Sequence, residues 1–318
     1  MSETCGDHIV RSFPVKDGRF LHHWHKANSM TDHALLNVLE RIADSLERMS
    51  PKPPSADILK HHDAFIWQAA MGTLTPVEKV SGVTLSLLRG IERQISQVMT
   101  NTRHFAAGFT ANNVMLWGAR GMGKSSLVKA SIASVNAEQR AKGQPTLALI
   151  EIQRDELSTL PKLLAVLRTT DRRCILFCDD LSFESQDADY KSLKSVLDGG
   201  IGGRPDNVLV YATSNRRHLM PRDMIENETG SAINPSEAIE EKVSLSDRFG
   251  LWIGLYGASQ DEYLDIVQTY AAARKLPVSP EDLRRKALQW ALTRGSRSGR
   301  VAAQFIDDLS ADLGIPTS

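Results

Sequence analysis

The sequence has few cysteines, no net charge and no long hydrophobic run. Only three of its 318 residues are cysteine. Cys174 and Cys178 lie in one apolar run at a spacing that places both on the same face of a strand. We expect both to be buried and reduced, because no Cys-x-x-Cys or histidine-containing spacing typical of a metal site accompanies them. The histidines at 22, 23, 25, 61 and 62 also match no metal-binding pattern, which favours surface or interface positions.

The charge balance and the hydrophobic pattern exclude further classes of protein. Lysine and arginine number 38, as do aspartate and glutamate, so no overall basic field indicates a nucleic-acid or membrane surface. No run of eighteen apolar residues occurs, and residues 1–5 lack the basic start and apolar stretch of a signal peptide. We therefore expect a soluble, cytoplasmic protein. A length of 318 residues and a hydrophobic content of 42% support a globular core with room for two domains.

The most informative segment runs from Gly118 to Ser125 and matches the phosphate-binding pattern G-x-x-x-x-G-K-[ST]. An apolar strand is predicted before it, over 113–117, and a helix after it, over 125–133. Glycines let the backbone adopt positive φ, so that successive N–H groups and the helix N-terminus can bind phosphate oxygens. Lys124 is predicted to contact the β- and γ-phosphates, and the Ser125 hydroxyl is placed to bind Mg²⁺. The predicted nucleotide-binding residues are Gly118, Ala119, Arg120, Gly121, Met122, Gly123, Lys124, Ser125 and Ser126.

A second acidic site follows the predicted strand over 174–179. Ligands collect at the carboxyl ends of parallel strands, where Asp179 and Asp180 stand. We expect Asp179 to orient Mg²⁺ and Asp180 to align or deprotonate the attacking water. The alternative is that both carboxylates only cap the following turn and helix.

The order of predicted elements indicates an α/β protein. Strands at 113–117, 147–152, 174–179, 208–213 and 251–255 alternate with helices, which is typical of a parallel sheet covered on both faces. The predicted fold is thus a five-stranded parallel sheet between helices, with nucleotide-binding core 83–256. Helices predicted at 260–274, 280–293 and 298–313 form a C-terminal lid, 257–318.

Residues 1–82 are predicted to form an N-terminal helical region. Thr31 can cap one helix, whose apolar residues recur at 35, 39, 42, 46 and 49, and Ser55 can cap a second that continues through Ile58, Phe65 and Ile66. The favoured interpretation is that these helices pack onto the main domain. A partner-binding face is the alternative.

These motifs together resemble the AAA+ ATPases, over about residues 88–313. The glycine pattern and Lys124, the Asp179–Asp180 pair, and Asn215 at the end of the next strand fit that superfamily in order. The resemblance implies that Asn215 helps to position water near the γ-phosphate. It implies that Arg248, in the segment 245–250, is an arginine finger presented to a neighbouring subunit, with a surface ion pair as the alternative. It also implies that Arg300 in the lid reaches over the phosphates, with Arg297 as a competitor. Residues 88–91 resemble, weakly, the segment beside the adenine.

The resemblance extends to a bacterial family of AAA-type ATP-binding proteins with no assigned role. It implies an ATPase that hydrolyses Mg-ATP to drive a conformational change on a protein partner, as a homo-oligomer with shared sites. Asp180 stands where most members of the superfamily carry glutamate, so hydrolysis is expected to be slow. One alternative is therefore a nucleotide-dependent binding module with little turnover, associated with nucleic acid as helicase loaders are. Basic clusters at 216–218 and 284–286 keep DNA or RNA open as a partner, although not the favoured one. A small-molecule kinase is the second alternative.

Overall fold

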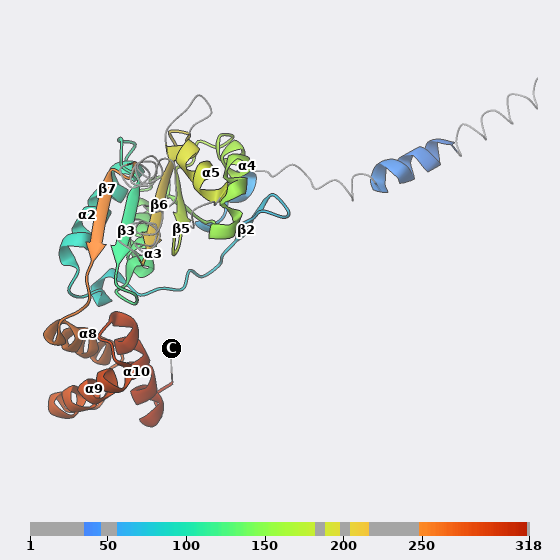
Figure 1. Ribbon diagram of the computed structural model, residues 1–318. Helices are drawn as coiled ribbons and strands as arrows, with labels where there is room; N and C mark the ends of the chain where they lie inside the picture. Colours follow the sequence, from blue (N-terminus) through green and yellow to red (C-terminus); the bar gives the residue numbers. More distant parts are fainter. Residues whose placement is uncertain (1–34, 46–55, 182–187, 198–203, 216–247, 317–318) are drawn as a thin grey trace, which may run out of the picture. The chain divides into compact units, whose positions relative to one another are not determined.

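A computed structural model of the chain describes residues 35–45, 56–181, 188–197, 204–215 and 248–316. The chain divides into two units, Met1–Pro53 and Pro54–Ser318. In the first unit the described residues form one helix over 35–45 (Figure 1). Among the described helices, none combines the length and the apolar character that crossing a bilayer requires.

The second unit is built on one seven-stranded sheet with the order β2-β1-β4-β5-β6-β3-β7 (Figure 1). All neighbouring strands run parallel except β1 and β2, which form an antiparallel hairpin. The strands are β1 Ala64–Gln68, β2 Thr73–Pro76, β3 Val114–Gly118, β4 Ala148–Glu151, β5 Cys174–Cys178, β6 Val208–Ser214 and β7 Leu251–Leu255. The predicted α/β class and parallel core are confirmed, but the prediction of five strands is wrong, because β1 and β2 extend the sheet.

The two additional strands lie within the segment that the sequence predicts to be helical. The helix predicted from Ser55 is limited to a 3-10 turn, η1 Ala56–Lys60, and the chain then enters β1. Trp67 is buried, and its indole N–H donates to the Thr159 hydroxyl at 2.8 Å. The partly buried Arg172 guanidinium donates to backbone oxygens around the start of β1 and pairs with Asp63. These contacts fix the hairpin beside β4.

Helices cover both faces of the sheet. Side chains alternate along β5, so that Cys174, Leu176 and Cys178 enter one core and Ile175 and Phe177 the other. The first core is covered by η3 Arg154–Thr159, α4 Leu160–Leu167 and α5 Ala188–Leu197. The second is covered by α2 Glu92–Ala106 and α3 Lys124–Ala141, after the short η2 Leu85–Leu87. Both cysteines are buried thiols, as predicted, and burial raises the pKa of Cys174 to about 12.

Three helices follow β7 (Figure 1). Their apolar side chains form a hydrophobic core of their own. The helices are α8 Gln260–Ala273, α9 Pro280–Arg294 and α10 Gly299–Asp312. Their starts follow the expected capping chemistry. Ser259 and Glu262 form a reciprocal capping box on α8, and Ser279 and Ser298 cap α9 and α10 by accepting backbone N–H bonds.

Candidate functional site

The loop between β3 and α3 has a backbone that only glycine allows at its key positions. Gly118, Gly121 and Gly123 have φ values of 128°, 77° and 87°. A Cβ atom on Gly118 would lie 1.9 Å from the carbonyl oxygen of Leu255, a distance that no side chain tolerates. Gly123 is the left-handed N-cap of α3. The loop therefore leads directly into a helix N-terminus, which is the arrangement that binds phosphate.

Lys124 is held in the centre of this loop. Its Nζ donates three bonds of 2.9 Å, to the carbonyl oxygens of Gly118 and Ala119 and to Oδ1 of Asn215. The residue is only 7% exposed. Burial lowers the pKa of the ammonium group, Arg300 and Arg120 lower it further, and Asp180 and Asp179 oppose the shift. With Lys124 itself, three basic groups face two carboxylates here, an arrangement suited to a polyanionic ligand.

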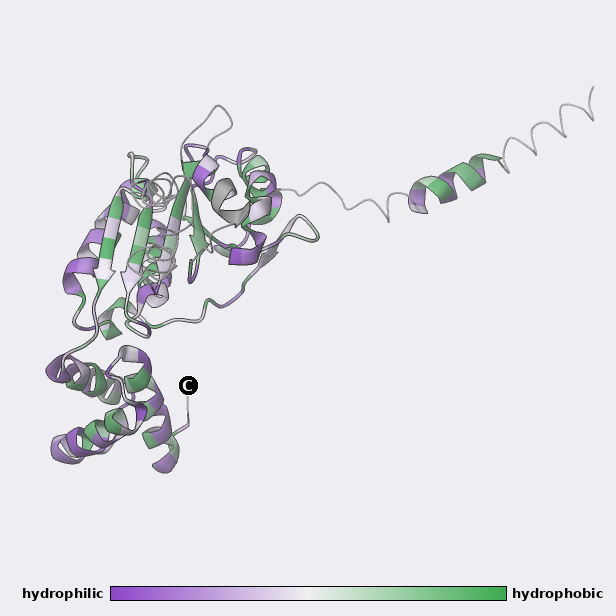
Figure 2. Ribbon diagram, in the orientation of Figure 1, coloured by the Kyte–Doolittle hydropathy of each residue, from purple (hydrophilic) through white to green (hydrophobic). Residues whose placement is uncertain are grey.

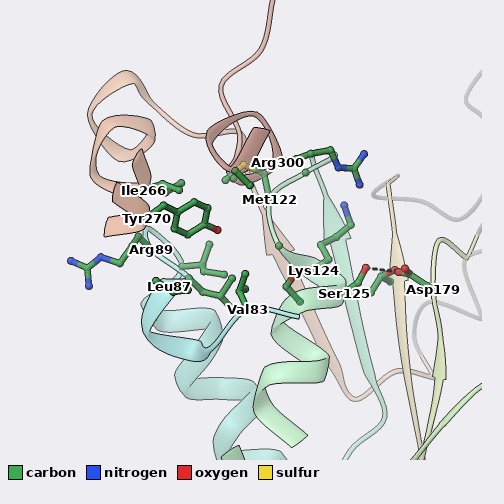
Figure 3. Close-up of a pocket in the computed structure, with 18 of the residues that line it drawn as sticks. Val83, Leu87, Arg89, Met122, Lys124, Ser125, Asp179, Ile266, Tyr270 and Arg300 are labelled. Atoms are coloured by element: carbon green, nitrogen blue, oxygen red, sulfur yellow. Dashed lines mark hydrogen bonds between the residues drawn. The ribbon is translucent and has the colours of Figure 1, made fainter. Parts of the chain in front are cut away.

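Asp179 accepts bonds from two hydroxyl groups. Ser125 Oγ donates to its Oδ1 at 2.6 Å (Figure 3), and Thr213 Oγ1 donates to the same oxygen at 2.5 Å. Hydroxyl and carboxylate oxygens are the hard ligands that Mg²⁺ prefers, usually one or two from the protein, with water and substrate phosphate completing the shell. The paired oxygens of Ser125 and Asp179 beside the loop therefore fit a magnesium ion. Thr213 was not predicted, because a threonine inside a strand gives no signal of such a role.

Asp180 and Asn215 are joined to the same network. Asn215 Nδ2 donates to Asp180 Oδ1 at 2.5 Å, so this amide bridges the carboxylate and Lys124. Asp180 has a φ of 52°, and its N–H donates to Thr213 Oγ1 at 2.9 Å. Three strand ends, those of β3, β5 and β6, thus bring the predicted residues together at one edge of the sheet.

The lid contacts the loop through the start of α10. The Arg300 N–H donates to the Gly121 carbonyl at 3.1 Å, and a Cβ on Gly121 would lie 2.8 Å from Ser298 Oγ. Arg300 lines the same cavity as Lys124, whereas its competitor Arg297 lines a separate hollow within the lid. Of the two arginines, Arg300 is therefore the one placed toward the loop.

A cavity of about 460 Å³ joins the loop to an apolar pocket, a size typical of small-molecule sites. Figure 3 shows Lys124, Ser125 and Asp179 on one side and Tyr270, Ile266 and Leu87 on the other. Burial raises the pKa of Tyr270, which keeps its hydroxyl protonated. The apolar lining is Val83, Leu87, Leu88, Ile91, Met122, Ile266 and Ala303. Of these, Leu88, Ile91 and Met122 fall in segments singled out in the sequence. The cavity is suited to a molecule with a flat apolar end and an anionic end.

The other predicted residues differ in their positions. Met122 and Ser126 line the cavity, whereas Ala119 and Arg120 are exposed in the loop and do not line it. Arg248 lies in the turn before β7, where the buried Phe249 anchors the chain. Because β7 runs parallel to β3, with Leu251 beside Val114 and Leu255 beside Gly118, this turn lies at the opposite edge of the sheet from the loop.

Several sequence features lie outside the described residues or away from the site. The basic cluster 216–218 and residues 245–247 lie outside the described residues. Arg284, Arg285 and Lys286 are exposed on α9, and Arg285 pairs with Asp282 at 2.9 Å. Within the described ranges, no group of three or more His, Cys, Asp or Glu side chains could hold a metal ion.

A family model described as a protein of unknown function (DUF815) matches residues 60–313, most of the chain. The chain belongs to the DUF815 family. This membership agrees with the resemblance to a family of unassigned role. No curated protein matches this DUF815 chain significantly.

Solved structures similar to this DUF815 chain include the Aeropyrum pernix ORC1 protein in complex with DNA, at 14% identity and a TM-score of 0.42. That match covers 71% of this chain and 66% of ORC1, so the chain spans slightly less than two thirds of that relative. Thermotoga maritima RuvB, a Holliday junction branch migration motor, matches at 12% identity, 73% and 85% coverage and a TM-score of 0.41. The A. pernix ORC2 protein, solved in ADPNP–ADP complexes, matches at 13% identity, 73% and 70% coverage and a TM-score of 0.45. Identities of 12–14% limit these similarities to the fold.

Replacing Thr213 by valine tests the connection between Asp179 and Asp180 in this DUF815 protein. The change keeps the shape but removes the donor to Asp179 and one of the two acceptors of the Asp180 N–H, the other being Asp179 Oδ1 at 3.2 Å. A single intramolecular hydrogen bond contributes about 0.5–1.5 kcal/mol to stability, so we expect a loss of this order in urea unfolding. Titration with Mg²⁺ should show that the variant binds the ion more weakly than the wild type does. Thr169→Val is the matched control, since that hydroxyl bonds only its own helix end away from the cavity. An equal effect of both variants would contradict the assignment.

Proposed function

We propose that this DUF815 protein binds Mg-ATP in the cavity between the sheet and the lid and hydrolyses it to move the lid and neighbouring subunits, acting on a protein partner. The observation that carries the proposal is the continuity of one cavity from Lys124 and the Ser125–Asp179 pair to the apolar pocket around Tyr270. That combination matches the anionic and flat ends of a nucleoside triphosphate.

Each residue has a defined task in this proposal. Backbone N–H groups of the loop and the start of α3 bind the phosphate oxygens, and Lys124 neutralises their charge. Ser125 and Asp179 would hold Mg²⁺, which when bound supplies further positive charge at the β- and γ-oxygens. Asp180 accepts a proton from water or orients it, and Asn215, already bonded to Asp180 and Lys124, positions that water.

The two arginines act from different directions. Arg300 is tied to the loop through its backbone and extends over the phosphates from the lid. Arg248 lies at the far edge of its own sheet, so we propose that it serves the nucleotide of a neighbouring copy. An always-charged planar guanidinium is suited to stabilising phosphate charge in the transition state. The protein therefore acts as a homo-oligomer with shared sites.

Removal of magnesium tests the proposed hydrolysis. The wild-type protein should release phosphate from ATP in Mg²⁺ without any acceptor, and excess EDTA should reduce the rate about 100-fold, because metal charge lowers the barrier by several kcal/mol. Adding Mg²⁺ back should restore the rate. Far-UV circular dichroism in EDTA is the control and should not change, since the described residues include no cluster suited to a structural metal.

The same measurement separates the alternatives. Tight Mg-ATP binding without phosphate release would favour a binding module, which the short Asp180 side chain motivates. Phosphate transfer that requires a small-molecule acceptor would favour a kinase. Phosphate release that persists in EDTA would contradict the magnesium site.

A further inference from the structure

The helix over residues 35–45 presents an unusual amount of apolar surface. Every one of its residues is exposed. Five large apolar side chains, Leu35, Leu36, Val38, Leu39 and Ile42, are between 48% and 59% exposed. Figure 2 shows hydrophobic and hydrophilic residues along this helix, drawn in blue in Figure 1. A helix of this length is marginal alone in water, so its apolar side needs a partner.

The apolar residues form one wide face. At about 100° per residue, the five side chains and Ala43 occupy an arc of about 160°. Ser45, at the border of this arc, turns its hydroxyl back to the Arg41 carbonyl at 2.7 Å, which satisfies it within the helix. Positions 35, 39 and 42 follow the four-then-three spacing of a heptad seam, and the sequence continues it with apolar residues at 46 and 49.

Opposite charges border the two sides of the apolar face. On the helical projection Glu40 lies beside Leu36 at one border, and Arg41 lies beyond Ser45 at the other. Helices that bind anionic membrane surfaces carry mainly lysine and arginine on the polar side. Here that side has one basic and two acidic residues, Arg41, Glu40 and Asp44, which argues against lipid as the partner.

We propose that the helix 35–45 packs in parallel against the same helix of other copies of this chain, in a bundle of more than two. In a parallel arrangement around a common axis, the Glu40 border of one helix faces the Arg41 border of the next, and every pair is attractive. An antiparallel two-fold pair would place like borders together. The arc is also wider than the seam of a two-stranded coil, so each helix can contact two neighbours.

This inference rests on the proposed function in one respect, namely that a site completed by Arg248 of a neighbouring copy needs copies held together. A helix of eleven residues, 35–45, is short for a free coiled coil. Tethering to assembled domains raises the effective concentration of the helices, so that a modest contact still adds to the stability of the assembly.

The apolar face is tested with the full chain, in the absence of nucleotide, by sedimentation over a dilution series. The substitution Leu39→Glu should raise the concentration at which the assembly dissociates by at least about tenfold, because it buries a charge in every copy. Asn37→Glu, on the polar side of the same helix, is the matched control and should leave the concentration unchanged within about twofold. A wild-type chain that stays monomeric, or an assembly unaffected by Leu39→Glu, would overturn the inference. So would a Leu39→Glu variant whose monomer loses thermal stability while its assembly is unchanged, since the helix would then pack on its own chain.

The parallel orientation is tested by charge reversal. Glu40→Arg and Arg41→Glu should each weaken assembly, and the double variant should restore it, because both borders are again opposite in sign. Failure of the double variant to restore assembly would overturn the parallel arrangement. These measurements need no hydrolysis and can be repeated with Lys124→Ala. Loss of assembly on changing the helix is thus distinguishable from absence of phosphate release, which would contradict the proposed function instead.

Discussion

Lys124→Ala is expected to abolish ATP hydrolysis, with a fall in turnover of at least about 100-fold and much weaker nucleotide binding. Lys124 is 7% exposed, and its amine donates to two loop carbonyls and Asn215, so it is already in place to meet phosphate oxygens. Alanine removes the positive charge from a site where burial makes charge interactions strong. It also frees Asn215, whose amide orients Asp180.

The measurement combines phosphate release with calorimetric titration of ATP. Lys129→Ala is the matched control on the same helix. That amine lies 3.8 Å from Glu151 and 5.9 Å from the centre of the Phe177 ring, and it does not line the nucleotide cavity. Circular dichroism of both variants checks that the fold is kept. Normal ATP affinity and turnover in Lys124→Ala would overturn the assignment of the loop.

Arg248→Ala is expected to remove turnover while leaving ATP affinity nearly unchanged. Strand β7, from Leu251 to Leu255, is about 13 Å long at about 3.3 Å per residue. Arg248 precedes the start of that strand, whereas the loop lies at its other end. Arg248 is therefore placed to act on a neighbouring copy. Loss of an arginine that contacts phosphate only in the transition state lowers turnover, by about 1000-fold or more in related chemistry, without lowering affinity.

Mixing experiments show whether the arginine acts between copies. The Arg248→Ala variant has an intact loop, and the Lys124→Ala variant has an intact Arg248. In an equal mixture, random assortment should therefore place an intact loop beside an intact Arg248 at about one quarter of the interfaces, and activity should return there. Arg173→Ala is the control, since Arg173 precedes β5 at the same edge of the sheet, and it should retain turnover. If both variants enter one assembly and no activity returns, the site is not shared.

The sequence predicts those elements of the fold that have a recognisable pattern in consecutive residues. Cys174–Cys178 is an apolar run that ends in two aspartates, and residues 113–118 end in a glycine loop, so both strands could be assigned directly. β1 has the apolar and aromatic composition of a strand, but one partner is β4, more than 80 residues away. Its other partner follows a turn whose only signal is Gly72. Pairing over such distances leaves no periodicity to detect.

The candidate site divides in the same way. Its phosphate end is carried by a motif, because phosphate binding constrains successive backbone positions and therefore consecutive residues. The apolar end is built from single side chains, such as Val83, Ile266 and Tyr270, on segments nearly two hundred residues apart. Apolar residues contribute to that end only through their shape, so any apolar residue of similar size could take their place. Their position became visible only when the lid and the sheet were placed together.

The close contact at Gly118 has a mechanical consequence. The Ala119 N–H bonds the Leu255 carbonyl at 3.0 Å, and Gly118 leaves no room for a side chain against the same oxygen. Leu255 is the last residue of β7, and only four residues connect it to α8. The phosphate loop and the base of the lid are thus clamped at one point. Helix α8 is about 21 Å long at 1.5 Å per residue. A small rotation of the chain at this contact would therefore displace the far end of α8 by more than it displaces the loop.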